Sequence, residues 1–443
     1  MSSGSTAREL SRKSLETFVL RLISQLAMTV AGIIIARAFG PGGKGIYAYA
    51  TTVLALALTV SSGQSSAISW QYGRLKIASS TVYAAMLRFM GIVIVPLALA
   101  LAIVGFVRRD PGLWAAALVL PFAYLNQTTL AFFMSDGKVR WANIQGSLVP
   151  GFFLAAICVV AFVFHAGMIA VLIVWIVAYA LVSVRSVAAV APYRLRPRGE
   201  ANIWETFRQQ AGFAAKASLN QLMQALNFQI DLFIILYALG AKSLGVYSVA
   251  VGIGQLMWYI SRPLAVSSYG PVTSGTKSEA AYLTIVCLRH AIAMVGAACI
   301  FLFFAGPYLI ELLYGGRFSG AGLAMRWILP GIVAYCALPF FGQFFVLQLG
   351  RPSIMIVSAG ISTVLCAAVT LALISRFGIV AGSIGTSISY LGSFAFMAIV
   401  FQRETKISPL AIFAYSRKDI GHYVELMRAA AGKIARMLQW RAT

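Results

Sequence analysis

Apolar stretches of about 20 residues follow one another along most of the chain, separated by short polar or glycine-containing interruptions. Because a helix rises 1.5 Å per residue, such a stretch matches the hydrocarbon thickness of a bilayer. In lipid only helices and closed barrels satisfy the backbone, and these stretches are too long for barrel strands. The pattern predicts an all-α polytopic membrane protein with about twelve transmembrane helices, near Leu15–Ala38, Ile46–Ser69, Tyr83–Phe106, Leu113–Met134, Ile144–Phe164, Met168–Val190, Gly212–Leu239, Leu244–Ser267, Leu283–Phe304, Leu323–Leu349, Ile354–Ser375 and Val380–Gln402.

Polar segments divide this pattern into two lobes of six helices. The predicted order is a polar N-terminal tail, a first lobe, a basic connector, a second lobe and a basic amphipathic tail, at residues 1–14, 15–190, 191–211, 212–402 and 403–443. The last segment has the composition of a helix that lies on the membrane surface.

The charged residues orient the chain. Of 443 residues 60% are hydrophobic and 11% charged, against about a quarter charged in soluble domains. With the N-terminus cytoplasmic, 25 of the 35 Lys and Arg residues fall on the cytoplasmic side and eight on the other. This bias predicts that both termini are cytoplasmic. The net charge of +23 is thereby explained by loops that set topology, so we expect no nucleic-acid partner.

The two predicted lobes repeat a sequence pattern. The segments Ala38-Phe39-Gly40 and Gly45-Ile46-Tyr47 recur 200 residues later as Ala238-Leu239-Gly240 and Gly245-Val246-Tyr247. Two weaker echoes follow in the same order: Phe132-Phe133 with Gly137 matches Phe344-Phe345 with Gly350, and Gly167 matches Gly378. Both lobes start from the same side, which predicts a parallel pseudo-repeat around a central cavity with alternating access.

A polar stripe marks the seventh predicted helix. Its members are spaced by four, four, three and four residues, so they share one helical face: Lys216, Asn220, Gln224, Asn227 and Asp231. Facing lipid, the charges alone would cost several kcal/mol, so the stripe faces protein or water. It is either a polar seam between helices or one wall of the cavity. Asp231, deep in the span, is either a protonatable or cation-coupled site or the neutralising partner of an arginine.

Three cations stand about two turns inside the predicted cytoplasmic ends of their helices: Arg21, Lys216 and Arg289. Gln25 shares the face of Arg21 one turn further in. If all three face the cavity, they form a basic mouth suited to a diphosphate, which arginine binds in a bidentate manner. The alternative is that these long side chains extend to the membrane interface.

Two segments resemble a known family. Residues 36–50, ARAFGPGGKGIYAYA, are similar to the first hinge of the polysaccharide-biosynthesis exporters, the Wzx-type flippases of the multidrug/oligosaccharidyl-lipid/polysaccharide exporter superfamily. Residues 229–236, QIDLFIIL, leading to Gly245-Val246-Tyr247-Ser248, resemble its seventh-span signature. The resemblance implies a V-shaped bundle that moves an undecaprenyl-diphosphate-linked oligosaccharide from the cytoplasmic to the periplasmic leaflet of a bacterial inner membrane. Implied partners are this lipid-linked oligosaccharide, membrane lipid, H⁺ or Na⁺, and a polysaccharide polymerase with other assembly proteins.

The sequence carries no pattern typical of an enzyme, and we expect no catalytic residue, cofactor or metal site. It has no G-x-x-x-x-G-K-[ST] loop, and its five cysteines and three histidines are scattered. One alternative function is multidrug or organic-cation antiport, which requires several cavity carboxylates; here basic groups outnumber the acids. A polysaccharide polymerase or glycosyltransferase is a more distant alternative, because no long outer loop or D-x-D motif occurs.

Overall fold

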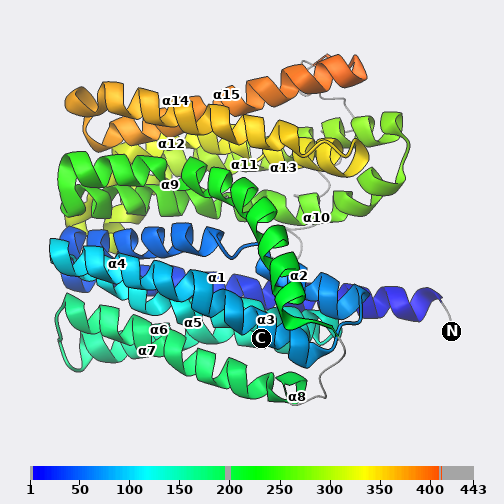
Figure 1. Cartoon of the computed structure of the whole chain (residues 1–443). Coiled ribbons are helices and arrows are strands. Elements are labelled where there is room, and N and C mark those ends of the chain that lie inside the picture. Colours follow the sequence, from blue (N-terminus) through cyan, green and yellow to red (C-terminus); the bar gives the residue numbers. More distant parts are fainter. Residues whose placement is uncertain (1–2, 195–200, 409–410, 412–443) are drawn as a thin grey trace, which may run out of the picture. The chain divides into compact units, whose positions relative to one another are not determined.

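The computed structural model of the chain describes residues 3–194, 201–408 and 411, and most of the predicted amphipathic tail, residues 403–443, lies outside them. These residues form helices and no strand (Figure 1). Three of the elements are short π-helices, η1, η2 and η4, and η3 is a single 3₁₀ turn. In chain order the elements are α1 Ser3–Thr59, α2 Gln64–Ile68, η1 Ser69–Arg74, α3 Ser79–Phe89, η2 Met90–Ile94, α4 Val95–Arg108, α5 Pro111–Ser135, α6 Val139–Phe162, α7 Met168–Ala189, α8 Ala191–Arg194, α9 Ile203–Leu256, α10 Trp258–Ser274, α11 Lys277–Tyr314, η3 Gly316–Phe318, α12 Gly320–Tyr335, α13 Leu338–Gln343, η4 Phe344–Gln348, α14 Ser353–Phe377 and α15 Ile379–Thr405.

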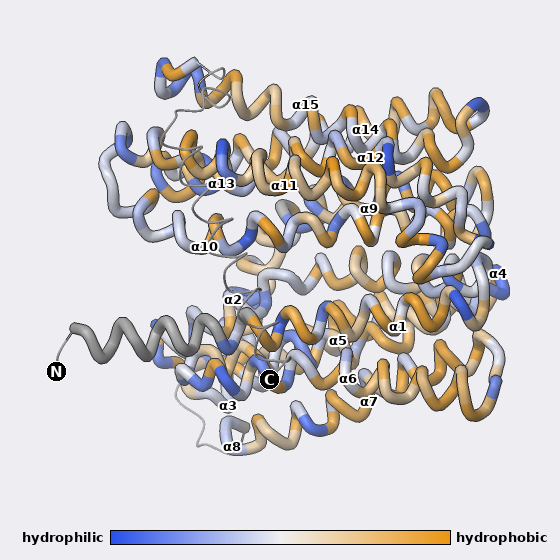
Figure 2. Tube along the Cα trace, turned by 180° about the vertical axis from the view of Figure 1, so that it is seen from behind, coloured by the Kyte–Doolittle hydropathy of each residue, from blue (hydrophilic) through white to orange (hydrophobic). Residues whose placement is uncertain are grey.

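The chain is a multi-pass membrane protein. In its described part, ten helical stretches are long and apolar enough to cross a bilayer. Apolar residues run along their length, while hydrophilic ones gather towards helix ends and loops (Figure 2). Two of the stretches, Val19–Arg74 and Gln221–Ser274, have 56 and 54 residues, each more than twice the roughly 20 that one crossing needs. Twelve crossings would fit these lengths, and the number stays a prediction.

The long helices α1 and α9 each bend at one glycine. Gly40 in α1 has φ +66° and Gly240 in α9 has φ +80°, a backbone region that side chains with a Cβ disfavour. The sequence predicts that a glycine ends one helix here and a second glycine opens the next. The structure shows a tighter arrangement, because the helix resumes directly after a single non-helical residue.

The second sequence echo corresponds to matching local geometry. Gly137 and Gly350 both adopt positive φ, at +71° and +66°. The following residue donates its N–H back to the second phenylalanine in each case: Lys138 to Phe133 and Arg351 to Phe345, both at 2.8 Å. The later copy contains one extra residue, and the π-helix η4 accommodates it, since a π turn holds one residue more than an α turn.

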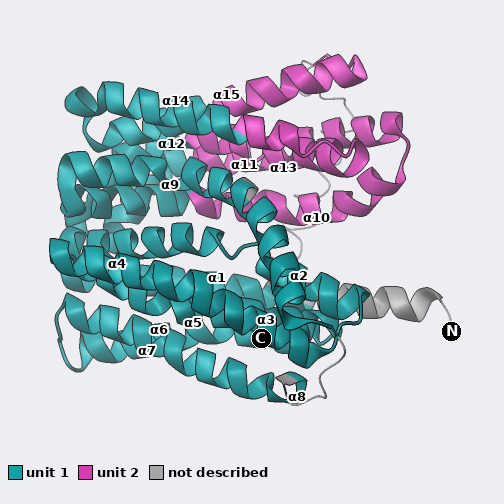
Figure 3. Cartoon of the chain, in the orientation of Figure 1, with its two compact units in different colours: residues 1–254, 302–328, 359–389 teal, residues 255–301, 329–358, 390–443 magenta. Residues whose placement is uncertain are grey.

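The chain divides into two compact units (Figure 3). Unit 1 comprises residues 1–254, 302–328 and 359–389, and unit 2 comprises residues 255–301, 329–358 and 390–443. Unit 1 has an aromatic core in which the ring of Tyr47 stacks on Phe153 at 5.6 Å and meets the edge of Trp175. In unit 2, Phe401 packs on Phe341 and Phe344. The predicted division into two six-helix lobes stays a prediction.

The first turns of α9 lie against the helices that follow α1 in unit 1. The helix begins at Ile203, inside the predicted connector, because the Asn202 carboxamide caps it by accepting from the N–H of Trp204 at 2.8 Å. Gln210 and the carbonyl of Thr206 bond to Gln71 of η1. One turn on, Ala214 lies so near Gly63 that a Cβ on the glycine would be 2.7 Å from its Cα.

Candidate functional site

The polar stripe of α9 changes character along its length. Lys216 is exposed and Gln224 is half-buried, whereas Asn227 and Asp231 are 4% and 2% exposed. The structure does not describe the side chain of Asn220. Asn227 and Asp231 therefore lie in the interior of unit 1, whereas the opposite end of the stripe, at Lys216, is exposed.

Asp231 accepts three hydrogen bonds at the buried end of this stripe. Its Oδ2 accepts from the hydroxyls of Tyr247 at 2.5 Å and Thr386 at 2.9 Å, and its Oδ1 accepts from the N–H of Leu232 at 2.8 Å. In the described part of the chain none of these partners is a cation. A carboxylate buried in a membrane protein without a counter-charge favours taking up a proton or a small cation. Two roles were predicted for Asp231, and this geometry favours a protonatable or cation-coupled site over the neutralising partner of an arginine.

A glycine on α15 makes room for the Asp231 cluster. A Cβ on Gly382 would lie 2.9 Å from Cζ of Tyr247 and 2.6 Å from Cδ1 of Ile235. Tyr247 was singled out in the sequence only as part of a hinge, and Thr386 was not singled out at all. Tyr247 follows Asp231 by sixteen residues and Thr386 by 155, so no helical spacing connects them to the stripe.

When the two halves of the sequence repeat are compared over the described residues, only the second half carries this cluster. At an offset of 200 the counterparts of Asp231 and Tyr247 are Ala31 and Tyr47, and at 211, the offset of the third echo, the counterpart of Thr386 is Trp175. Ala31 and Trp175 are both buried, and the hydroxyl of Tyr47 is buried with no hydrogen-bond partner among the described residues. The first half thus keeps the tyrosine but replaces the carboxylate and the hydroxyl with apolar groups.

The three predicted cavity cations have different surroundings. Arg21 is exposed, and Gln25, one turn along α1, is half-buried. Arg289 is half-buried in unit 2, where its Nη2 donates to the carbonyl of Ala411 at 2.9 Å. Arg21 and Lys216 belong to unit 1. That all three line one mouth stays a prediction.

A fourth cation was not singled out by sequence reasoning. Arg185, in the last turns of α7, donates to the Gln145 carboxamide oxygen, and Nε2 of Gln145 donates to Ser186. The Ser186 hydroxyl lies 2.7 Å from Oδ1 of Asn126. This network links α5, α6 and α7. In the sequence, Arg185 could have been found as a basic residue within an apolar run, as Arg21 and Lys216 were.

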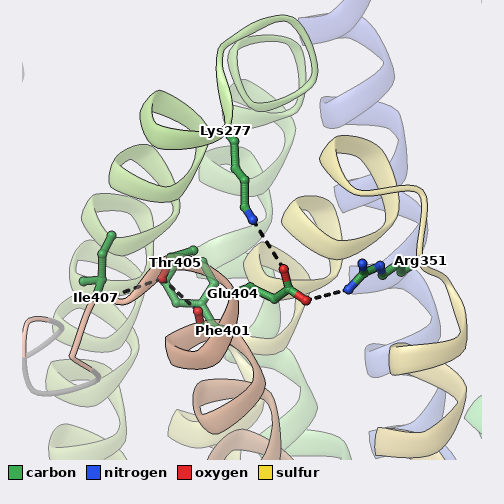
Figure 4. Close-up of polar contacts among 6 residues, drawn as sticks. All are labelled: Lys277, Arg351, Phe401, Glu404, Thr405 and Ile407. Atoms are coloured by element: carbon green, nitrogen blue, oxygen red, sulfur yellow. Dashed lines mark hydrogen bonds and ion pairs between the residues drawn. The ribbon is translucent and has the colours of Figure 1, made fainter.

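Two charged clusters occupy matching positions. Each joins the loop before the fifth predicted helix of a lobe to the end of the sixth predicted helix of the same lobe. In unit 1, Asp136 accepts from Tyr193 at 2.5 Å and Tyr72 at 2.8 Å, with Lys138 Nζ at 3.4 Å. In unit 2, Glu404 pairs with Arg351 at 2.5 Å and Lys277 at 3.3 Å (Figure 4). Burial by itself raises the pKa of Asp136, but the hydrogen bonds from Tyr193, Tyr72 and Lys138 outweigh it and lower the pKa below its usual value.

Known proteins support this description of the chain. A family model described as "Polysaccharide biosynthesis protein" matches residues 34–321. Among solved structures, the lipid II flippase MurJ in an inward closed conformation aligns over 90% of this chain and 88% of its own, with 13% identity and a TM-score of 0.71. An inward-facing multidrug resistance MATE family transporter of the MOP superfamily aligns over 88% and 99%, with 14% identity and a TM-score of 0.71.

A MOP superfamily transporter from Pyrococcus furiosus, described as having a binding pocket of reverse polarity, aligns over 90% and 96% with 13% identity and a TM-score of 0.63. These likenesses establish the fold, and they confirm the resemblance noted in the sequence. A search of curated protein sequences finds no match.

Proposed function

Because the chain belongs to the polysaccharide biosynthesis protein family, we propose that it is a flippase that moves an undecaprenyl-diphosphate-linked oligosaccharide from the cytoplasmic to the periplasmic leaflet of a bacterial inner membrane. Family and fold are those of transporters and flippases rather than enzymes. Translocation proceeds by alternating access, with both termini in the cytoplasm. The delivered oligosaccharide then passes to a polysaccharide polymerase and other assembly proteins.

One observation favours an anionic substrate over an organic cation. The two acids in the predicted first and seventh helices, which also carry Arg21 and Lys216, are both engaged: Asp231 accepts three hydrogen bonds in the interior, and Glu16 pairs with Arg140 at 3.1 Å. Arg21 and Lys216 are exposed, and the described residues offer neither an ion pair. An organic cation therefore finds no free carboxylate here, whereas a diphosphate finds cations that can bind it.

In this mechanism the two parts of the stripe have separate tasks. Lys216, with Arg21 and Arg289, binds the diphosphate, and Gln25, Asn220 and Gln224 form the polar wall that the sugar headgroup passes, whereas Asn227 lies with Asp231 in the interior. Asp231 couples movement to an ion gradient by binding H⁺ or Na⁺. Its partners Tyr247 and Thr386 come from two other helical segments, α9 beyond its bend and α15, so a change in the charge of Asp231 alters how these segments hold together.

The substrate assignment is tested in cells depleted of the protein and supplied with variants. We expect lipid-linked repeat units to accumulate in the cytoplasmic leaflet of depleted cells, and an Arg21→Ala, Lys216→Ala double variant to fail to restore translocation. Lys242→Ala, an exposed cation on the same helix near its bend, is the matched control and should restore it. Unchanged translocation after depletion would refute the flippase proposal, and full activity of the double variant would refute the cation roles.

The coupling assignment needs a second assay, in proteoliposomes with an imposed pH or Na⁺ gradient. Asp231→Asn keeps the size of the side chain but removes its negative charge, and the hydroxyls of Tyr247 and Thr386 can turn to accept from the amide group. We expect this variant to bind substrate normally and to lose the stimulation of transport by the gradient. Whichever gradient stimulates the wild type identifies the ion, and undiminished stimulation in Asp231→Asn would exclude Asp231 from coupling.

A further inference from the structure

An apolar groove lies within unit 1 on the side of α9 away from the polar stripe. Its volume is about 770 Å³, and its walls come from the second half of α1, from α3, η2 and α4, from Leu113 of α5, and from α9. On α9 the lining residues Ala211, Ala215, Ser218 and Leu222 recur at spacings of four, three and four. At 100° per residue this face points about 170° away from the stripe of Lys216 to Asp231. The groove is therefore separate from the proposed substrate path.

Along α3, η2 and α4 the lined stretch of the groove has about the length of one lipid leaflet. Phe89, Val93, Leu97 and Leu101 line it along one face of α3, η2 and α4, and twelve residues of helix rise about 18 Å. Leu219, also in the lining, is 56% exposed. An apolar surface of this extent in a membrane-spanning region suits a hydrocarbon chain.

Cations and an aromatic ring stand at one end of the groove, where the helices reach the predicted cytoplasmic side. The face of α9 that lines the groove continues backwards through Arg208 and Trp204, at spacings of three and four. The guanidinium of Arg88, the residue before Phe89, lies 5.2 Å from the centre of the Trp204 ring. Its Nη1 is buried and has no hydrogen-bond partner among the described residues. A buried guanidinium nitrogen without a protein acceptor is able to bind an anionic group.

We propose that this groove is a binding site for one glycerophospholipid of the cytoplasmic leaflet, with an acyl chain along α4 and α9 and the phosphate at Arg88 and Arg208. Trp204 takes the interfacial position that tryptophan favours between chain and headgroup. The bound lipid fills the space between α9 and the helices of the first half, beyond the close contact of Ala214 with Gly63. It therefore holds the first turns of α9 in place without entering the substrate path.

The test is native mass spectrometry of the full-length protein, delipidated in detergent and titrated with a single synthetic phosphatidylglycerol. We expect one tightly bound copy in the wild type, and about tenfold weaker binding in Arg88→Gln and in Arg208→Gln, the effect of losing one charge-assisted hydrogen bond. Arg74→Gln removes an exposed cation at the end of η1, outside the groove, and should bind as the wild type does. Equal binding in all four proteins, or no bound copy in the wild type, would overturn the proposal.

A second measurement locates the lipid and does not depend on the arginine variants folding well. A phosphatidylglycerol with a photoreactive acyl chain should cross-link to peptides of α4 and α9, and Ala215→Phe, which fills the groove, should abolish these cross-links. Cross-links confined to other helices would contradict the site. If undecaprenyl phosphate binds at the groove and displaces the phospholipid, the occupant is a substrate tail and the phospholipid assignment is wrong. Translocation assays are not needed, so this test stands apart from that of the proposed function.

Discussion

Gly45 and Gly245, counterparts in the sequence repeat, lie against each other at the start of the second segments of α1 and α9. A Cβ on Gly245 would be 1.9 Å from the carbonyl oxygen of Pro41 and 2.8 Å from the nitrogen of Gly45, and one on Gly45 would be 1.7 Å from the carbonyl oxygen of Ala241. Only residues without a side chain allow the two backbones to approach this closely. Both bends lie on the predicted periplasmic side, so this contact joins α1 and α9 there.

Gly245→Val should separate the two bends. The added carbon atoms have no space beside Pro41, and overpacking of this kind costs about 1–3 kcal/mol. We expect a lower melting temperature in detergent and loss of translocation. Gly252→Val, on the same helix at a glycine where an added Cβ would meet nothing within 4 Å, is the control. Equal melting temperatures for the two variants would show that the contact does not hold the bends together.

Tyr247→Phe and Tyr47→Phe form a matched pair across the repeat. The first variant removes a hydroxyl that donates to the buried Asp231, and the second removes one with no described partner. Leaving a buried carboxylate short of a donor costs about 1–3 kcal/mol. Thermal unfolding should therefore show a clear destabilisation for Tyr247→Phe and little or none for Tyr47→Phe. The reverse order would mean that Asp231 does not depend on Tyr247.

The Asp136 cluster predicts a stability contribution that depends on pH. Hydrogen bonds from Tyr193, Tyr72 and Lys138 lower the folded-state pKa of Asp136, so its contribution is complete above the unfolded value of about 3.9 and is lost as the pH falls through the lower folded value. The difference in melting temperature between the wild type and Asp136→Asn should be constant above about pH 5 and shrink towards pH 3.

Tyr72→Phe tests the cause of this shift. With one donor removed, the folded-state pKa of Asp136 rises towards its unfolded value, so the stability lost on acidification should be smaller than in the wild type and should be complete at a higher pH. A difference between the wild type and Asp136→Asn that stays constant down to pH 3 would show that the cluster does not lower the pKa.

Glu404→Gln should affect unit 2 mildly and in a salt-dependent manner. The carboxylate pairs with Arg351 and Lys277, which are 57% and 50% exposed, and exposed pairs contribute less than about 1 kcal/mol each. We expect a small fall in melting temperature at low ionic strength that about 0.5 M salt removes, since salt screens exposed charges. Glu311→Gln, an exposed acid outside this cluster, is the control, and an equal fall there would contradict the prediction.

Much of the architecture could be read from the order of the residues. The apolar runs predicted helices because a bilayer allows few other structures, and the glycines at 40 and 240 marked the bends because only glycine adopts positive φ at no cost. The start of α9 was missed although Asn202, followed three residues later by Glu205, is a capping signal. The basic composition of the connector obscured it.

The Asp231 site could be read only in part. The spacing of the stripe placed Lys216, Asn227 and Asp231 on one face, since helical periodicity is a local property. It did not reveal that one end is buried and the other exposed, or that Thr386 completes the site from 155 residues away.

The sequence by itself determined a multi-pass helical chain, the positions of its bends and the members of its polar face, because these follow from hydrophobicity, glycine and the helical repeat, which act over a few residues. Only the tertiary structure decided which repeat carries a buried carboxylate with hydrogen-bond donors, that Gly45 meets Gly245, and that α1, α4 and α9 together line an apolar groove. These depend on packing between segments far apart along the chain, and in a repeated sequence the two halves differ at single positions such as Ala31 and Asp231. The role of such a position is known only when its neighbours in the folded chain are known.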